Sequence, residues 1–143
     1  TAEIYRQVEQ FEQILESIVV EQQWKNDTRV ILFVKLKDDI LLDLNLIDSI
    51  IDRRVQRGQH LKVIYTHKNG IRRFSNPQLL REAKFLPRKK FPFDSGIAIA
   101  PNHSIRFYSY TKGFIGVWIE DSDMANTLKT IFDICWQVAQ KEK

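Results

Sequence analysis

The feature that most constrains the fold is a strand, a helix and a second strand joined by short connections. Residues 30–34 form an apolar run rich in β-branched side chains, which is typical of a strand buried on both faces. Residues 41–57 carry apolar side chains at helical spacing, and Gly58 follows as a helix stop. Residues 61–65 form a second apolar run. We therefore expect a βαβ unit with parallel strands.

The second half of the chain predicts short elements separated by turn residues. Asn76 and Pro77 suit the N-cap and first position of a short helix, which we expect to end near Ala83 before a brief strand at 84–86. Residues 88–94 read as a loop. Three strands at 96–100, 104–110 and 114–120 are separated by turn residues, so we expect an antiparallel meander.

A final helix is predicted after residue 120. Asp121 or Ser122 can cap it, and Lys141 and Lys143 place positive charge at its end. Its apolar face is predicted to comprise Met124, Leu128, Ile131, Phe132, Cys135, Val138 and Ala139. We interpret Cys135 as a core residue and not as a nucleophile.

The first 23 residues have the pattern of a separate helix. Apolar residues recur at spacings of four and three, which forms a narrow heptad stripe: Ile4, Val8, Phe11, Leu15 and Ile18. Such a stripe suits a single partner helix. We expect a dimerisation helix over 1–23, and the alternative is a helix that packs on its own domain.

Positive charge is concentrated in the middle of the chain. Residues 53–90 carry twelve basic side chains and one acidic side chain, Glu82. This block is either ordinary solvated surface or a binding surface for an anionic ligand or polyanion. The single cysteine excludes an internal disulfide, and we expect a cytoplasmic protein. No apolar run is long enough to span a bilayer, so no membrane association is expected.

Several short segments resemble the C-terminal effector domain of TrmB-like transcription regulators. They are Phe85-Leu86-Pro87, Phe91-Pro92-Phe93, Gly96-Ile97-Ala98-Ile99, Ile115-Gly116-Val117-Trp118-Ile119-Glu120-Asp121, Met124-Ala125 and Phe132 with Cys135-Trp136. The resemblance implies a phospholipase-D-like α/β domain over 24–143, with a mixed sheet of parallel and antiparallel strands flanked by helices. In this family a winged helix-turn-helix and a coiled-coil helix precede the domain. We therefore expect a fragment of a DNA-binding regulator that forms homodimers and contacts DNA through a domain outside this chain.

The resemblance also gives an expectation about catalysis. Catalytic phospholipase-D-like proteins use the motif H-x-K-x-x-x-x-D, in which His attacks phosphorus and Lys stabilises the phosphate oxygens. The H-x-K of this chain is His60-Leu61-Lys62, and His67 stands where the motif requires Asp. At the place that the resemblance implies, residues 94–97 contain neither His nor Lys. We expect no catalytic residues, no metal and no cofactor.

A ligand site is expected at the carboxyl edge of the parallel strands, where α/β units bind their ligands. Its candidate residues are Lys35, Tyr65 and His67 at the strand ends, with Arg72, Arg73, Arg88 and Lys89 in basic loops. We expect a small anionic ligand, or a sugar as in well-known members of the family. Two other functions stay open: a direct nucleic-acid-binding module that uses residues 53–90, and a divergent phosphodiesterase that uses His60, His67 or His103.

Overall fold

The computed structural model describes residues 2–5, 30–35, 44–100, 103–109 and 115–142. Within these residues, eight strands form one sheet in the order β1-β7-β6-β5-β2-β3-β4-β8. The strands are β1 (Ala2–Tyr5), β2 (Val30–Lys35), β3 (Leu61–Thr66), β4 (Arg81–Phe85), β5 (Gly96–Ile99), β6 (Ser104–Ser109), β7 (Ile115–Glu120) and β8 (Gln140–Lys141). The helices are α2 (Leu44–Gln56), the 3-10 turn η1 (Pro77–Leu79) and α3 (Ser122–Val138).

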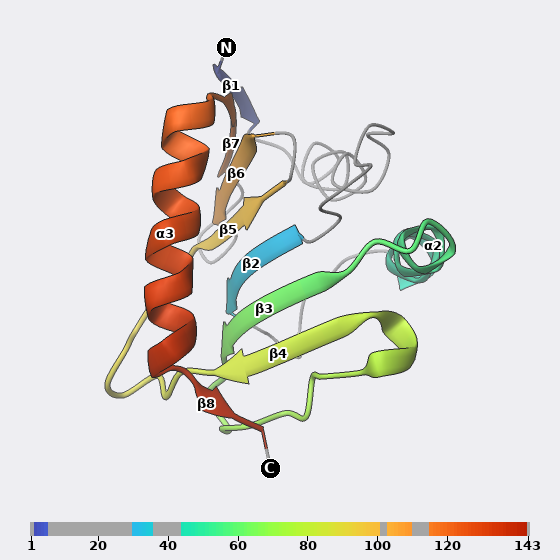
Figure 1. Ribbon diagram of the computed structural model, residues 1–143. Coiled ribbons are helices and arrows are strands. Elements are labelled where there is room, and N and C mark those ends of the chain that lie inside the picture. The colour runs from blue at the N-terminus through green and yellow to red at the C-terminus, as the bar shows by residue number, and fades with distance from the viewer. Residues whose placement is uncertain (1, 6–29, 36–43, 101–102, 110–114, 143) are drawn as a thin grey trace.

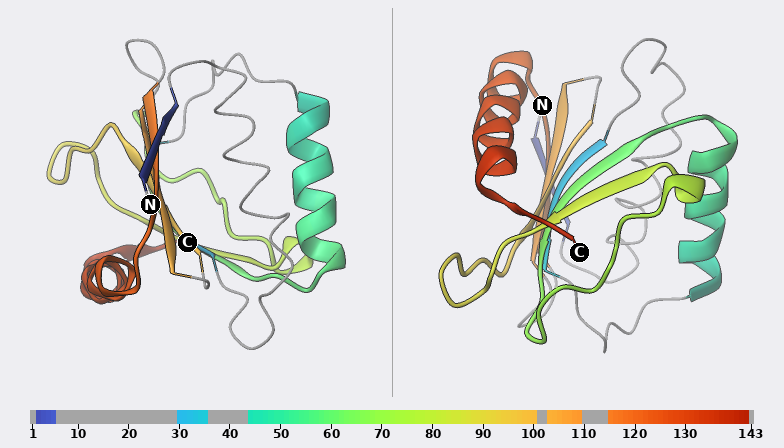
Figure 2. Two further views of the ribbon diagram at one scale, coloured as in Figure 1. Left: turned by 90° about the horizontal axis from the view of Figure 1, so that it is seen from above. Right: turned by 60° about the horizontal axis from the view of Figure 1, so that its bottom comes forward.

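The sheet lies between two helices (Figures 1 and 2). Helix α3 covers one face, and α2 lies on the opposite side. The core on the α3 side joins Ile64, Ile99 and Ile105 of the sheet to Phe132 of α3. A smaller cluster on the other face contains Val63, Tyr65, Ala83 and Phe85. Successive side chains of a strand point to opposite faces, which is why neighbouring residues of β3 enter different clusters.

The predicted βαβ unit and the predicted meander are both confirmed. Strands β2 and β3 are parallel, with Lys35 beside Thr66, and β3 and β4 are also parallel. Strands β5, β6 and β7 form an antiparallel meander. Strand β5 pairs with β2 in the antiparallel sense and so joins the two halves. The expected mixed α/β sheet is therefore present.

Local sequence signals account for the helix ends. The carboxylate of Asp121 accepts a hydrogen bond from the backbone N–H of Met124 at 2.8 Å, so Asp121 is the N-cap of α3. After α2, Gly58 takes a left-handed φ of +66°, the conformation that a helix stop requires. Asn76 caps η1, with Pro77 at its first position, as predicted.

The prediction of a helix from the first residue is wrong over residues 2–5. These residues form β1, in which Ile4 pairs with Val117 of β7. An unpaired edge strand exposes backbone donors and acceptors, and pairing with β1 satisfies those of β7. The rest of the predicted helix, with Val8, Phe11, Leu15 and Ile18, lies outside the described residues. The same is true of the predicted domain boundary after residue 23.

The short helix predicted to end near Ala83 is also wrong. Leu80 takes a left-handed φ of +53° and ends η1, and the chain then enters β4. Ala83 and Phe85 alternate into the cluster with Val63 and Tyr65. The burial of these side chains against β3 outweighs a weak local helix signal.

Helix α3 forms as predicted, but only part of its predicted apolar face contacts the sheet. Phe132 and Ala139 lie in the core, and Leu128 and Cys135 pack against it, as predicted. Ala125, Phe132 and Ala139, seven residues apart, are buried. The predicted core residues Met124, Ile131 and Val138 are instead exposed by 53%, 46% and 58%. Periodicity shows that a helix is amphipathic, but it does not choose which part of a broad apolar surface contacts the sheet.

The predicted positive end of α3 is wrong as well. The helix stops at Val138, and no basic residue lies in its last turn. Lys141 belongs to β8, and Lys143 lies outside the described residues. Pairing with the exposed edge of β4 draws the chain out of the helix.

Candidate functional site

The carboxyl edge of β3 is the centre of the candidate site. Tyr65 and Thr66 are fully buried, and His67 follows at 2% exposure. The parallel register places Lys35 beside Thr66 at the same edge. The sequence therefore predicted correctly which strand ends meet here.

His67 organises the turn that follows β3. Its Nδ1 accepts a hydrogen bond from the backbone N–H of Asn69 at 3.0 Å, and its carbonyl oxygen accepts one from Gly70 at 3.1 Å. Gly70 has a φ of +86°, which only glycine adopts without strain. These contacts make His67 a structural residue of the turn.

The side chain of Tyr65 connects this edge to the end of the chain. Its ring lies between the rings of Phe74 and Phe85, with centroid distances of 5.7 and 5.5 Å. Its hydroxyl oxygen accepts a hydrogen bond from the Arg72 N–H at 2.9 Å and donates one to the carboxylate of Glu142. Tyr65 therefore joins the basic loop to the last described residue.

The Glu142 carboxylate is held mainly by backbone donors. It accepts hydrogen bonds from the N–H groups of Phe74 at 2.6 Å and Ser75 at 2.7 Å. The preceding residue, Arg73, has a left-handed φ of +53°. Successive N–H groups in such a turn form a nest that binds anions. We call these donors, together with the Tyr65 hydroxyl and the Arg81 guanidinium, the anion nest.

Arg81 supplies the positive charge of the anion nest. Its Nε donates to the carbonyl oxygen of Phe74 at 2.6 Å, and its guanidinium lies 3.9 Å from the centroid of the Phe74 ring. Burial lowers the pKa of Arg81, and the nearby Glu142 carboxylate opposes this shift. The guanidinium is thus fixed against Phe74, and its charge acts on the Glu142 carboxylate.

The pKa shifts fit this arrangement. Burial, followed by the hydrogen bond to Glu142, raises the pKa of Tyr65 to about 12. Burial alone would raise the pKa of Glu142, but hydrogen bonds from Tyr65, Ser75 and Phe74 outweigh it, and the pKa falls below its usual value. The pair is therefore a neutral phenol that donates to a carboxylate.

The predicted basic residues divide between two loops. Arg72 and Arg73 are exposed beside the anion nest. Arg88 bonds within its own loop, to the Phe93 carbonyl oxygen at 2.9 Å and the Asp94 carboxylate at 2.5 Å. Lys89 is exposed in the same loop. Both loops leave the same edge, but they run in different directions (Figures 1 and 2). The first loop therefore keeps Arg72 and Arg73 near Tyr65. The second loop carries Arg88 and Lys89 away from them.

Three residues of this site were not predicted from the sequence: Arg81, Ser75 and Glu142. Glu142 is 77 residues from Tyr65 and 68 from Phe74, and backbone donors carry no side-chain signature. Arg81 had one local feature in the sequence, since it is the first basic residue after the Asn76-Pro77 cap. It did not indicate a partner.

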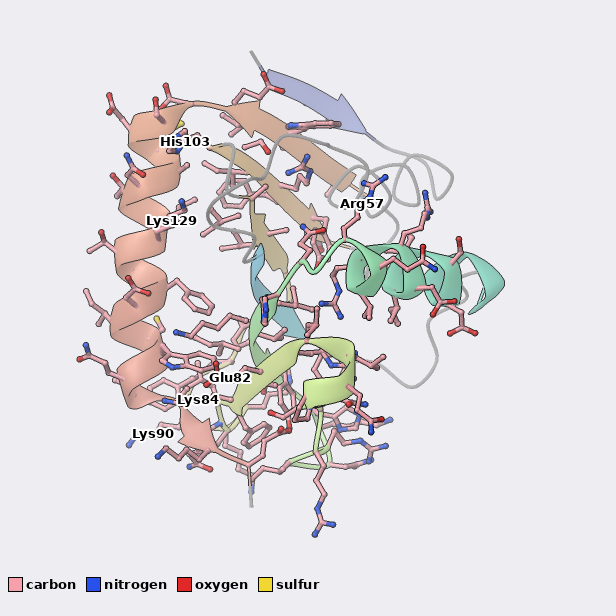
Figure 3. All side chains as sticks on the ribbon, turned by 45° about the vertical axis from the view of Figure 1, so that its right-hand side comes forward. Arg57, Glu82, Lys84, Lys90, His103 and Lys129 are labelled. Atoms are coloured by element: carbon pink, nitrogen blue, oxygen red, sulfur yellow. The ribbon has the colours of Figure 1, made fainter. Side chains whose placement is uncertain are left out.

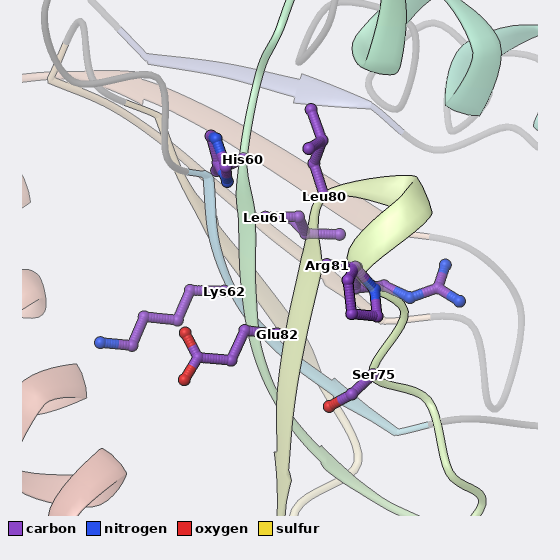
Figure 4. Close-up of a pocket in the computed structure, with 8 residues that line it drawn as sticks. His60, Leu61, Lys62, Ser75, Leu80, Arg81 and Glu82 are labelled. Carbon is purple, nitrogen blue, oxygen red and sulfur yellow. The ribbon is translucent and has the colours of Figure 1, made fainter.

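A pocket of about 390 Å³ adjoins the anion nest (Figure 4). Ser75 and Arg81 belong to both, and the other lining residues are His60, Leu61, Lys62, Pro77, Leu80 and Glu82. His60, Lys62 and Glu82 extend to one side of the two strands, and Arg81 extends to the other. The pocket lies at the amino ends of β3 and β4, away from His67.

Lys62 is engaged with helix α3. Its Nζ lies 4.4 Å from the centroid of the Trp136 ring, and that of Lys84 lies 4.6 Å from it. Lys84 also donates to the Trp136 carbonyl oxygen at 3.0 Å. Figure 3 shows Glu82 and Lys84 on the α3 side of β4. The H-x-K of this chain therefore places its lysine against an aromatic ring of the core.

Gly96 lies within residues 94–97, where the resemblance implies the catalytic motif. Gly96 pairs with Tyr108 across β5 and β6. A Cβ atom at Gly96 would lie 2.2 Å from Cζ of the Tyr108 ring, which is 5% exposed. The ring occupies the space that any side chain at this position would need.

The described residues contain neither a metal-binding cluster nor a membrane-spanning helix. No three His, Cys, Asp or Glu side chains in this part of the chain are grouped to hold a metal ion. Among the same residues, no helix has the length and apolar character needed to cross a membrane.

Comparisons with known proteins identify the fold. TrmBL2, an archaeal chromatin protein whose structure shows a novel mode of DNA binding, matches with a TM-score of 0.62 and 22% identity, over 99% of this chain and 54% of TrmBL2. Nuc, a phospholipase D family member from Salmonella typhimurium, matches with a TM-score of 0.68 and 10% identity, over 100% of this chain and 98% of Nuc. NucT from Helicobacter pylori matches with a TM-score of 0.67 and 11% identity, over 99% of this chain and 99% of NucT. The phospholipase-D-like fold, expected from the resemblance to TrmB-like regulators, is thus confirmed.

Comparisons at the level of sequence match only a small part of this chain. No family model matches the chain. A stretch of 36 residues is 53% identical to acetoacetyl-coenzyme A synthetase of Rhizobium meliloti. This stretch covers 25% of this chain and 6% of the synthetase. The chain spans about half the length of TrmBL2 and a small fraction of the synthetase.

Proposed function

We propose that this chain is the non-catalytic, phospholipase-D-like effector domain of a TrmB-like, DNA-binding transcription regulator. In this role it forms a homodimer and binds a small anionic ligand at the basic sheet edge. Tyr65, Arg72 and Arg73 contact the ligand, Lys35 and His67 lie at the same strand ends, and Arg88 and Lys89 add positive charge from the second loop. The fold that the chain shares with TrmBL2 supports the regulator, and the DNA contact belongs to a domain outside this chain.

The observation that carries the non-catalytic part is the packing of Tyr108 on Gly96. Nucleases share this fold, so the fold alone does not separate an enzyme from a regulator. Phosphodiester cleavage by the superfamily mechanism requires a cationic side chain beside the nucleophile. Gly96 supplies none, and Tyr108 fills the space for one.

Turnover of bis-p-nitrophenyl phosphate tests this part. We expect no turnover above that of a His60→Ala, His67→Ala variant. Lys129→Ala, which changes a residue of helix α3 and neither histidine, serves as the matched control. Turnover by the wild type and by Lys129→Ala that disappears in the histidine variant would establish the divergent phosphodiesterase instead.

A second candidate function is direct nucleic-acid binding, which the exposed Lys68, Arg72, Arg73, Lys89 and Lys90 favour. Contacts with phosphates release counterions, so such binding would weaken steeply between about 50 and 200 mM salt. We expect no such binding in fluorescence anisotropy with a labelled random duplex. Salt-sensitive binding that is lost in Arg88→Ala, Lys89→Ala but kept in Lys129→Ala would favour the nucleic-acid-binding module.

A further inference from the structure

The anion nest already contains an anion, and that anion is part of the chain. We propose that the nest is an oxyanion-binding site in which Glu142 stands in for a ligand, and that a small phosphate- or carboxylate-bearing molecule displaces it. This inference rests on the proposed ligand-sensing function and names its site and the class of ligand.

The donors of the nest match an oxyanion in number and direction. The N–H groups of Phe74 and Ser75 and the hydroxyl of Tyr65 converge on the two carboxylate oxygens of Glu142. Hydrogen bonds to a charged acceptor are stronger than neutral ones. Arg81 adds a fixed positive charge, and the ring of Phe74 holds its guanidinium in place. A phosphate or carboxylate presents the same pair of oxygens.

The backbone at Arg73 adopts an energetically unfavourable conformation that directs its donors into this site. Arg73 is a non-glycine residue in the left-handed region, with a φ of +53°. Such conformations are unfavourable for residues with a side chain and persist where the surroundings enforce them. Here the conformation directs the next two N–H groups to the same acceptor. Ser75 is held further by bonds between its hydroxyl and the backbone of Ala83 at 2.9 and 3.1 Å.

Glu142 is held by a short segment that an incoming ligand can replace. Strand β8 has two residues, which pair with Lys84 and Phe85 at the edge of β4. The nest itself is built from β3, the 67–76 loop and β4, and β8 is the edge strand next to β4. Release of Glu142 therefore leaves the donors in place while β8 comes free.

The surroundings provide space and charge for a ligand larger than a carboxylate. The pocket of about 390 Å³ shares Ser75 and Arg81 with the nest, so the body of a ligand can extend into it. Arg72 and Arg73 are exposed beside the nest. A phosphate monoester carries about two negative charges at neutral pH and matches these additional cations better than acetate does.

The test compares wild type, Glu142→Ala and the control Glu120→Ala by calorimetry and thermal unfolding. The probes are inorganic phosphate and acetate, with ionic strength held constant by NaCl. Wild type binds only through its minor state with a vacant nest, which weakens its apparent affinity. We expect Glu142→Ala to bind phosphate about tenfold more tightly than wild type and Glu120→Ala, with a larger rise in Tm. Acetate that matches phosphate would assign the site to monocarboxylates.

Two further variants locate the binding. Tyr65→Phe keeps the ring and removes one donor, so in the Glu142→Ala background it should weaken phosphate binding several-fold. Arg81→Met should abolish binding. Equal phosphate binding by Glu142→Ala and Glu120→Ala would overturn the inference.

The same data separate this inference from the proposed function. Phosphate binding by wild type that depends on Arg72 and is unchanged in Glu142→Ala would leave the sensing role intact and place its site elsewhere. Absence of binding in every variant would overturn the inference and the sensing role together.

Discussion

Tyr108 lies directly over Gly96, so that a Cβ atom at residue 96 would be 2.2 Å from the Tyr108 ring. Cross-strand pairing of an aromatic residue with glycine covers exposed backbone and stabilises a sheet. At this position the ring also leaves no room for a side chain on residue 96.

This packing predicts a non-additive double-mutant cycle. Gly96→Ala should lower the free energy of unfolding by about 1–3 kcal/mol, because Tyr108 must move. Tyr108→Ala should lower it by about 3–5 kcal/mol. The double variant should lose less than the sum, since without the ring the new methyl group meets no clash. Urea unfolding measures all three, and strict additivity would show that the two residues are not coupled.

The Glu142 contact predicts a stability that depends on pH. Its pKa is lowered in the folded protein, so its stabilisation is fully present above the ordinary value of 4.5 and is lost as the pH falls through the folded value. Glu142→Gln should cost about 1–3 kcal/mol at pH 7. Thermal unfolding from pH 7 to pH 3 should show the difference from wild type shrinking. Glu120→Gln, at the exposed end of β7, is the control, and a constant difference for Glu142→Gln would contradict the assignment.

Arg54 is predicted to stabilise the connection between α2 and the η1 turn. Its buried guanidinium donates to the carbonyl oxygens of Gln59 at 2.8 Å, Leu79 at 2.5 Å and Leu80 at 3.4 Å. Burial, with a smaller effect of Arg81, lowers its pKa to about 10. Arg54→Met should cost about 2–4 kcal/mol in urea unfolding, because buried carbonyl groups lose charged donors. The exposed Arg57→Met should cost less than 1 kcal/mol, and equal losses would refute this role.

The part of the predicted heptad stripe beyond β1, with Val8, Phe11, Leu15 and Ile18, predicts self-association. Burial of each large aliphatic side chain contributes roughly 1.5–3 kcal/mol before entropy losses. We expect light scattering at tens of micromolar to report a dimer for wild type and a monomer for Val8→Asp, Leu15→Asp. The control is Ile131→Asp, Ile134→Asp on the exposed side of α3. A dimer that only the α3 variant disrupts would assign the interface to α3, and a monomeric wild type would show that the stripe packs internally.

The sequence by itself determined the features that depend on local periodicity and on single residues. The βαβ unit follows from two β-branched runs around a helical pattern, and the meander follows from three short strands between turn residues. Asp121, Asn76 and Gly58 act at helix ends as their residue types predict. The absence of His and Lys from residues 94–97 was equally visible.

The tertiary structure decided what depends on partners far apart in the chain. Residues 2–5 form a strand because they pair with the otherwise unpaired edge of β7. Strand β8 forms because it pairs with the edge of β4. Which residues of the predicted apolar face of α3 are buried depended on the residues of the sheet that it contacts. The anion nest needed Tyr65 and Glu142, 77 residues apart, and N–H groups that every residue carries. Hydrogen bonding at sheet edges and backbone direction arise only when the chain has folded, so no local pattern can encode them.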